Sequence, residues 1–104
     1  MAQKVFEGTE VKLNINIEPI DGIYMKDYDF VVEFFCNSLK PKKVVINKSE
    51  AIMIDSSNYI FCVDTANVGK GKLECKVIAY IPDGDFKDGK RTEVARLSTG
   101  IEIG

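Results

Sequence analysis

Residues 10–18, EVKLNINIE, alternate apolar and polar side chains without a break. Successive side chains of a β-strand point to opposite faces, so a period of two predicts a strand with one buried face. A helix would instead bring together residues three or four positions apart. Pro19 would end this strand. Its interior face would consist of Val11, Leu13, Ile15 and Ile17.

The rest of the chain has the same character. Isoleucine and valine together number 22, whereas leucine and alanine number 9, and β-branched side chains favour strands over helices. Seven or eight short strands separated by turn residues, with no substantial helix, predict an all-β, immunoglobulin-like β-sandwich of antiparallel strands. We expect a single domain over residues 1–104. Besides residues 10–18, the expected strands are 4–6, 28–36, 44–48, 59–64, 71–81 and 92–103.

The segment DTANVGKG, residues 64–71, predicts how the two sheets are connected. Asp64 or Thr65 can cap a single helical turn, and Val68 can enter the core. Gly69 and Gly71 can adopt the left-handed conformations that start the next strand. We therefore expect a one-turn crossover from one sheet to the other. In the two long strands that follow, the interior faces would hold Leu73, Cys75, Val77, Ala79 and Ile81, and then Ala95, Leu97, Thr99, Ile101 and Ile103.

Catalysis is not indicated. The chain has no histidine, and its three cysteines show no CxxC spacing, so neither a zinc site nor a Cys–His pair can be assembled. We predict a non-enzymatic protein without a cofactor or metal. An odd number of cysteines argues against a disulfide framework. Each cysteine lies among apolar strand residues and should be a buried, reduced thiol: Cys36, Cys62 and Cys75.

Charge indicates neither a nucleic-acid partner nor a membrane partner. The net charge is −2, with 14 basic and 16 acidic residues, so no general field attracts a polyanion or an anionic membrane. The N-terminal residues contain no apolar run typical of a signal peptide. The one cationic cluster, Lys40, Lys42 and Lys43 around Pro41, is predicted to be a solvated turn.

The loop Pro82–Arg91, PDGDFKDGKR, holds three aspartates and two glycines. A calcium loop of the EF-hand type that started at Asp83 would have Asp85 at its third position. Lys87 would stand at the fifth position, which requires a ligand, and the flanking segments are strands instead of helices. We therefore predict a hairpin turn with a soluble tip.

Protein binding is the better candidate function. Three expected strands are apolar on the face that should meet solvent, and exposed apolar patches typically mark protein interfaces. If these strands are neighbours, the patch would contain Val31, Phe35, Ile78, Tyr80 and Val94. Alternatively, the apolar loop Pro19–Lys26 folds over that face as a lid. A carbohydrate-binding face around Tyr24, Asp27 and Tyr28 is a third, weaker interpretation.

Three stretches carry a resemblance to a known group: KVFEGTEVKLNINI, DYDFVVEFFC and YIFCVDTANVGKGKLECKVIAYIPDGDFKDGKRTEV. In their order they resemble Ig-like auxiliary capsid (decoration) and head-fibre-associated virion proteins of crAss-like tailed phages. The resemblance covers nearly the whole chain. It rests on strand order and on two motifs, DTxxVGxG and IPDxDFxDGxRTEV, and it is an analogy of fold and pattern.

The resemblance implies a structural virion protein, assembled in the host cytoplasm, that binds the major capsid protein or other virion proteins, or copies of itself. Asp83, Asp85 and Phe86, in the loop Pro82–Arg91, would then contact neighbouring subunits. The alternatives are an Ig-like tail, baseplate or fibre-attachment module and a module that binds a glycan or host surface.

Overall fold

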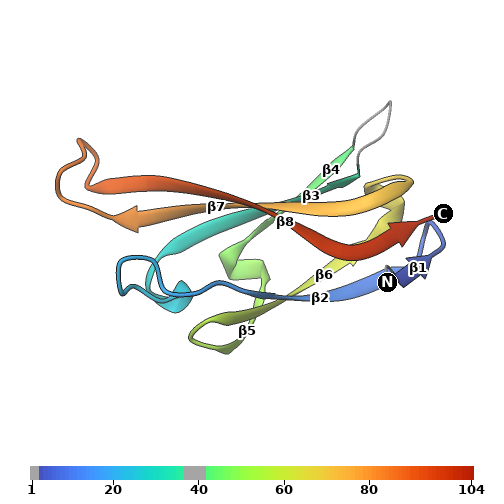
Figure 1. Ribbon diagram of the computed structural model, residues 1–104, viewed down its shortest axis with the longest axis horizontal. Helices are drawn as coiled ribbons and strands as arrows, with labels where there is room; N and C mark the ends of the chain where they lie inside the picture. Colours follow the sequence, from blue (N-terminus) through green and yellow to red (C-terminus); the bar gives the residue numbers. More distant parts are fainter. Residues whose placement is uncertain (1–2, 37–41) are drawn as a thin grey trace.

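The computed structural model describes residues 3–36 and 42–104 (Figure 1). Two sheets pack face to face, which confirms the predicted all-β sandwich. Lys40 and Pro41, and with them the predicted turn, lie outside the described residues. The strands in these ranges are β1 (Gln3–Val5), β2 (Glu10–Asn16), β3 (Asp29–Cys36), β4 (Lys43–Asn47), β5 (Ile52–Asp55), β6 (Asn58–Asp64), β7 (Gly71–Pro82) and β8 (Lys90–Ile103).

The two sheets differ in width. One has the order β1-β8-β7-β3-β4 and the other the order β2-β6-β5. These orders match the G-F-C and B-E-D strands of an immunoglobulin sandwich, with β4 added beside β3. The expectation that all strands are antiparallel is wrong for β1, which pairs in parallel with Ile101–Ile103 of β8. The first strand thus joins the wider sheet instead of lying beside β2.

The core forms where the inner faces of the sheets meet. Every predicted interior residue of β7 is buried, and so are alternate residues of β3 from Phe30 to Cys36. On β2, Leu13 and Ile15 are buried, and Val11 and Ile17 are partly covered. The period-two pattern therefore assigned these faces correctly, because alternate side chains enter one dry layer.

Strand β8 departs from its expected burial. Ile101 and Ile103 are buried, but Ala95 and Leu97 are exposed although they face the same side as the core residues of β7. Thr99 and Gly100 form a bulge, since Leu73 pairs with Ile101 while Glu74 pairs with Ser98. The narrower sheet does not reach under the first half of β8, and this leaves its inner face uncovered.

The crossover between the sheets has the predicted form. The 3₁₀ turn η3 (Thr65–Asn67) joins β6 to β7, and the Asp64 carboxylate accepts a hydrogen bond from the Ala66 N–H. Val68 is fully buried, and Gly69 and Gly71 have positive φ angles of 86° and 125°. Thr65 has a further role that its sequence position did not indicate. Its buried hydroxyl accepts from the Gly8 N–H at 2.9 Å and donates to the Thr9 carbonyl at 2.8 Å, and this pair of bonds holds the turn between β1 and β2.

The loop between β2 and β3 enters the end of the sandwich. Ile20 and Ile23 exchange two backbone hydrogen bonds around Asp21 and Gly22, both of which have positive φ, as a type I′ turn requires. Met25, in the 3₁₀ turn η1 (Met25–Asp27), is fully buried. Because Ile20 and Ile23 pack against the core, this loop does not cover the outer face, and the lid interpretation is wrong.

We predict that Thr65→Val lowers the free energy of unfolding by about 1–3 kcal/mol, because the Gly8 N–H loses its partner while the side-chain volume hardly changes. The Thr9 carbonyl would keep its bond from the Thr65 backbone N–H. Urea denaturation followed by far-UV circular dichroism measures the change. Thr65→Ser is the control, since it keeps the hydroxyl. Equal stability of Thr65→Val and the wild-type protein would contradict the role assigned to this hydroxyl.

Candidate protein-binding surface

The outer face of the wider sheet contains a short apolar strip. Val31 of β3 pairs with Ile78 of β7, and Ile78 pairs with Val94 of β8, so the three side chains are direct cross-strand neighbours. Tyr80 continues the strip along β7, where it pairs with Thr92. Val94, at the free edge of this part of β8, is 53% exposed. We call Val31, Ile78, Tyr80 and Val94 the outer strip.

Phe35 does not belong to this strip. One row of charged neighbours, Glu33, Lys76 and Arg96, lies between them. The Arg96 guanidinium lies 5.3 Å from the centre of the Phe35 ring, a cation–π contact that covers the ring. The expected continuous apolar patch is therefore divided in two.

The second part of the outer face is rich in cations. A shallow hollow of ≈ 400 Å³ is lined by Glu33, Phe35, Lys42, Lys43, Lys76 and Arg96. Lys43 Nζ lies 3.6 Å from Glu33 Oε2, which neutralises one of the four cations. The outer face thus combines an apolar strip with a net positive rim.

The loop between β7 and β8 is a hairpin, as predicted. Asp83 and Gly89 pair through a 2.8 Å backbone hydrogen bond, and Gly89 has a positive φ of 72°. The Asp83 Oδ1 accepts a hydrogen bond from the Asp85 N–H at 3.0 Å, which closes a turn at the start of the loop. Phe86 is about half exposed at the tip. In the part of the chain that the structure describes, no group of three acidic, cysteine or histidine side chains could hold a metal ion.

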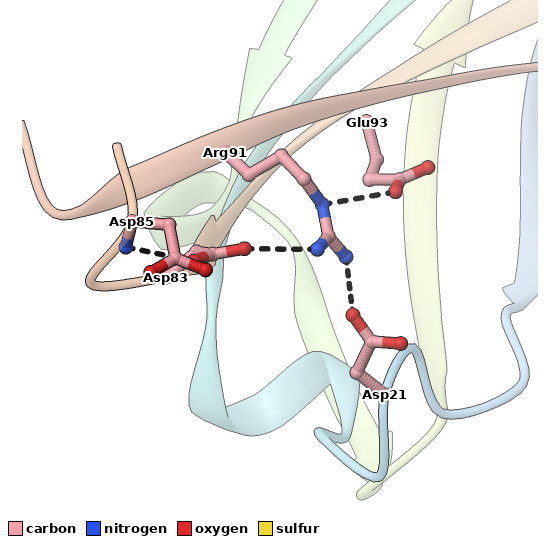
Figure 2. Close-up of polar contacts among 5 residues, drawn as sticks. All are labelled: Asp21, Asp83, Asp85, Arg91 and Glu93. Carbon is pink, nitrogen blue, oxygen red and sulfur yellow. Dashed lines mark hydrogen bonds and ion pairs between the residues drawn. The ribbon is translucent and has the colours of Figure 1, made fainter. Parts of the chain in front are cut away.

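Arg91 joins this hairpin to the loop after β2 (Figure 2). Its Nη1 donates to Asp83 Oδ2 at 3.0 Å, its Nη2 donates to Asp21 Oδ2, and its Nε lies 3.2 Å from Glu93 Oε1. The contact with Glu93 is an ion pair without hydrogen-bond geometry. The hydrogen bond with Asp21, followed by the ion pairs with the three carboxylates, raises the pKa of Arg91. Each carboxylate here is used to hold the loops in place.

This role of Arg91 had no signal in the sequence. Asp21 and Arg91 are 70 positions apart, so only the fold brings them together. The Asp21–Gly22 dipeptide was a usable signal, because Asp-Gly between apolar residues is typical of a tight hairpin.

A second group of exposed apolar residues was also missed. Ile52, Met53 and Ile54 are each more than half exposed on β5, the edge strand of the narrower sheet. Their segment did not show a clear alternation, and no strand was expected there.

The cysteines are not all alike. Cys36 and Cys75 are buried as predicted, but Cys62 is exposed, so that part of the prediction is wrong. Burial raises the pKa of the Cys75 thiol to about 11. Burial and then the charge of Glu74 raise the pKa of Cys36. The three cysteines are free thiols.

The carbohydrate interpretation is wrong for one of its three residues, Tyr28, whereas Tyr24 and Asp27 are exposed. Tyr28 is only 2% exposed, and its ring packs edge-on against Phe30. Its burial, followed by the charge of Tyr59, raises its pKa. Tyr28 is therefore part of the core and cannot form a platform for a sugar.

We predict that Cys62 alone reacts with iodoacetamide in the folded protein. With a pKa of about 11, the Cys75 thiol would be ionised in roughly one molecule in a thousand at pH 8, and the thiolate is the reactive form. Peptide mass spectrometry after brief alkylation measures the modification at each site. All three cysteines should react in urea, and equal alkylation of Cys62 and Cys75 without urea would contradict the prediction.

We predict that Arg91→Gln loosens the two loops without unfolding the sandwich. Amide hydrogen exchange around residues 20–23 and 83–89 should become faster, while exchange in β3 and β7 stays unchanged, because the guanidinium contacts only the loops and Glu93. Lys90→Gln is the control, since it removes one positive charge from the neighbouring position. Unchanged hydrogen exchange in both loops of Arg91→Gln would contradict the role of Arg91 in holding the two loops together.

Within residues 3–36 and 42–104, no helix has the length and apolarity needed to span a membrane. Comparisons of the chain with protein-family models, with curated proteins and with solved structures find no match.

Proposed function

We propose that this protein is a non-catalytic structural component that binds another protein through the outer face of its wider sheet. The observation that carries the proposal is the outer strip, in which Val31, Ile78 and Val94 adjoin one another across three strands. Apolar side chains gathered on a solvent-facing sheet are typical of protein interfaces.

The character of the remaining side chains supports binding over catalysis. The chain contains no histidine. Two of its three thiols are buried with raised pKa values, which disfavours the nucleophilic thiolate. The carboxylates around Arg91 are paired with it and hold loops together.

The charge beside the strip indicates what the partner surface should contain. Lys42, Lys43, Lys76 and Arg96 surround the hollow next to the strip, with Glu33 as the one acid in its lining. A partner with an apolar ridge and acidic groups along one side would match both parts. The apolar ridge would contribute most of the affinity, and the acidic groups would set the orientation.

The resemblance to auxiliary capsid proteins supports a virion protein as that partner, such as a capsid lattice or a fibre. On this proposal Phe86 and the loop around it, which stand away from the strip, reach a neighbouring subunit. Copy number in purified particles tests the location: hundreds of copies favour shell decoration, and a few to dozens favour a tail or fibre position.

We predict that Ile78→Lys and Val94→Lys each weaken partner binding about tenfold or more, because a charge then replaces the apolar centre of the contact. Affinity capture from lysate of cells that produce the particle, with quantitative mass spectrometry, measures retention of each co-purified protein. Glu102→Gln changes the charge of the same face by the same one unit at the far end of β8, where Glu102 pairs with Lys72, and should bind like the wild-type protein. Partner retention that is equal for wild type, Ile78→Lys and Val94→Lys would refute the outer strip as the interface.

A further inference from the structure

One long edge of strand β2 has no neighbour among the described strands. Its partner on the other side is β6, and the Ile17 N–H donates to the Ser57 carbonyl. Backbone groups alternate in direction along an antiparallel strand. Val11, Leu13 and Ile15 therefore pair with β6, as Ile17 does, while Lys12, Asn14 and Asn16 direct their N–H and C=O groups away from the sheet.

A groove runs along this free edge. One part, a cleft of ≈ 240 Å³, is lined by Leu13, Asn14, Ile15 and Asn16 of β2 and by Cys75, Leu97, Ser98 and Thr99 of the wider sheet. A smaller part continues the groove and is lined by Ile17, Ile20, Val77, Ala79, Glu93, Val94 and Ala95. We call these two parts together the β2–β8 groove.

The wider sheet provides an apolar wall for this groove. Ala95 and Leu97 share the face of β8 that turns toward the interior, since they pair with buried Val77 and Cys75. Leu97 is nevertheless 38% exposed. In Figure 1, β8 and β2 lie in the two facing layers of the sandwich, β8 in the upper and β2 in the lower. Apolar side chains at an interior position thus remain in contact with water.

The topology explains this opening. In immunoglobulin sandwiches the first strand lies beside the second in the A-B-E-D sheet. Here β1 pairs instead with Ile101–Ile103 of β8, on the other sheet. A strand placed next to β2 would therefore meet the unpaired backbone groups of β2 along one edge and the apolar side chains of Ala95 and Leu97 on the face toward β8.

We propose that the β2–β8 groove binds an extended segment of a partner protein, which adds to β2 as a fourth strand of the narrower sheet. The unpaired N–H and C=O groups of Lys12, Asn14 and Asn16 would form the ladder, as in other cases of strand addition. This site lies on the opposite face of β8 from the outer strip, with Val94 at the edge that the two share, and it does not depend on the proposed function.

The shape and charge of the groove specify the occupant. A strand beside β2 would need apolar side chains at alternate positions, which would lie under Ala95 and Leu97 beside Leu13 and Ile15. Its other side chains would face solvent next to Lys12, and a carboxylate there would complement that cation. Because β8 closes one side of the groove, a single extended segment fits, whereas the edge of a second sandwich would bring its own covering sheet against β8.

The test uses the full chain and a pool of synthetic peptides in which valine, isoleucine or leucine alternates with threonine, with one glutamate. Binding is measured by fluorescence anisotropy, and hydrogen exchange is measured by NMR for the amides of β2. We expect peptide binding to slow exchange of the Lys12, Asn14 and Asn16 amides about tenfold or more. The amides of Leu13 and Ile15, which already pair with β6, should change little.

Two variants and a matched control decide the site. Asn14→Pro removes an outward N–H and no backbone bond to β6, although it also removes the 3.4 Å side-chain contact with Asn58. Leu97→Lys places a charge in the apolar wall. Each should weaken peptide binding about tenfold or more. Thr92→Lys carries the same charge on the opposite face of β8, where Thr92 pairs with Tyr80, and should bind peptide normally.

Failure of every peptide in the pool to bind, with unchanged exchange at Asn14, would overturn the proposal. So would peptide binding that survives both Asn14→Pro and Leu97→Lys. If Asn14→Pro does not fold, Leu97→Lys against Thr92→Lys still decides the question, because both positions are exposed in the folded protein.

Discussion

The contact between the aromatic rings of β3 and β6 holds the two sheets together. Phe30 meets Tyr59 edge to face with ring centres 5.1 Å apart, and Phe34 meets Phe61 at 5.7 Å. These rings come from both sheets and are all buried. Truncating one such phenylalanine to alanine typically removes about 3–5 kcal/mol of stability. This contact places β6 of one sheet against β3 of the other. The positions of the outer strip and of the β2–β8 groove follow from that placement.

One consequence is that the narrower sheet cannot cover the wider one. With β6 centred under β3 by the aromatic rings, β2 lies under β7 and the adjoining side of β8, where Leu13 shares a cleft with Cys75 and Leu97. The first half of β8 then extends past the interior. Both surfaces that we assign to partners arise here: the outer strip ends at Val94 on this part of β8, and the groove lies beneath it.

Local pattern was sufficient for the described strands other than β5 and for the crossover, because these depend on neighbouring residues. The alternation in β2 and β7 fixed their buried faces, and the DTANVGKG segment fixed the turn around Val68. Local pattern was insufficient where both faces of a strand are apolar. In β6, Ile60 and Cys62 are as apolar as Tyr59 and Phe61, so the sequence alone could not show that Cys62 faces solvent.

Contacts between distant segments were beyond local pattern as well. The parallel pairing of β1 with β8 joins residues nearly a full chain length apart, and the uncovered inner face of β8 depends on it. The ion pairs of Arg91 likewise exist only once the loops after β2 and β7 meet at one end of the sandwich. The outer strip was predicted in part. Its residues could be named from the pattern of their strands, but the row of charged residues that separates Phe35 from them could be recognised only from the register between the strands.

The bulge in β8 has a consequence for how this chain can vary in length. Thr99 and Gly100 are two residues without ladder partners in β7, although the Thr99 hydroxyl donates to the Leu73 carbonyl at 2.7 Å. An even number of such residues leaves the alternation of side chains in phase on both sides. Losing both would keep Ile101 and Ile103 in the core with an unbroken ladder. Losing one would keep them there only with a single-residue bulge, because a regular ladder would then turn them to solvent and place Glu102 inside. Homologous chains can therefore differ in length here by two residues without a bulge, whereas a difference of one residue requires that a single-residue bulge remains.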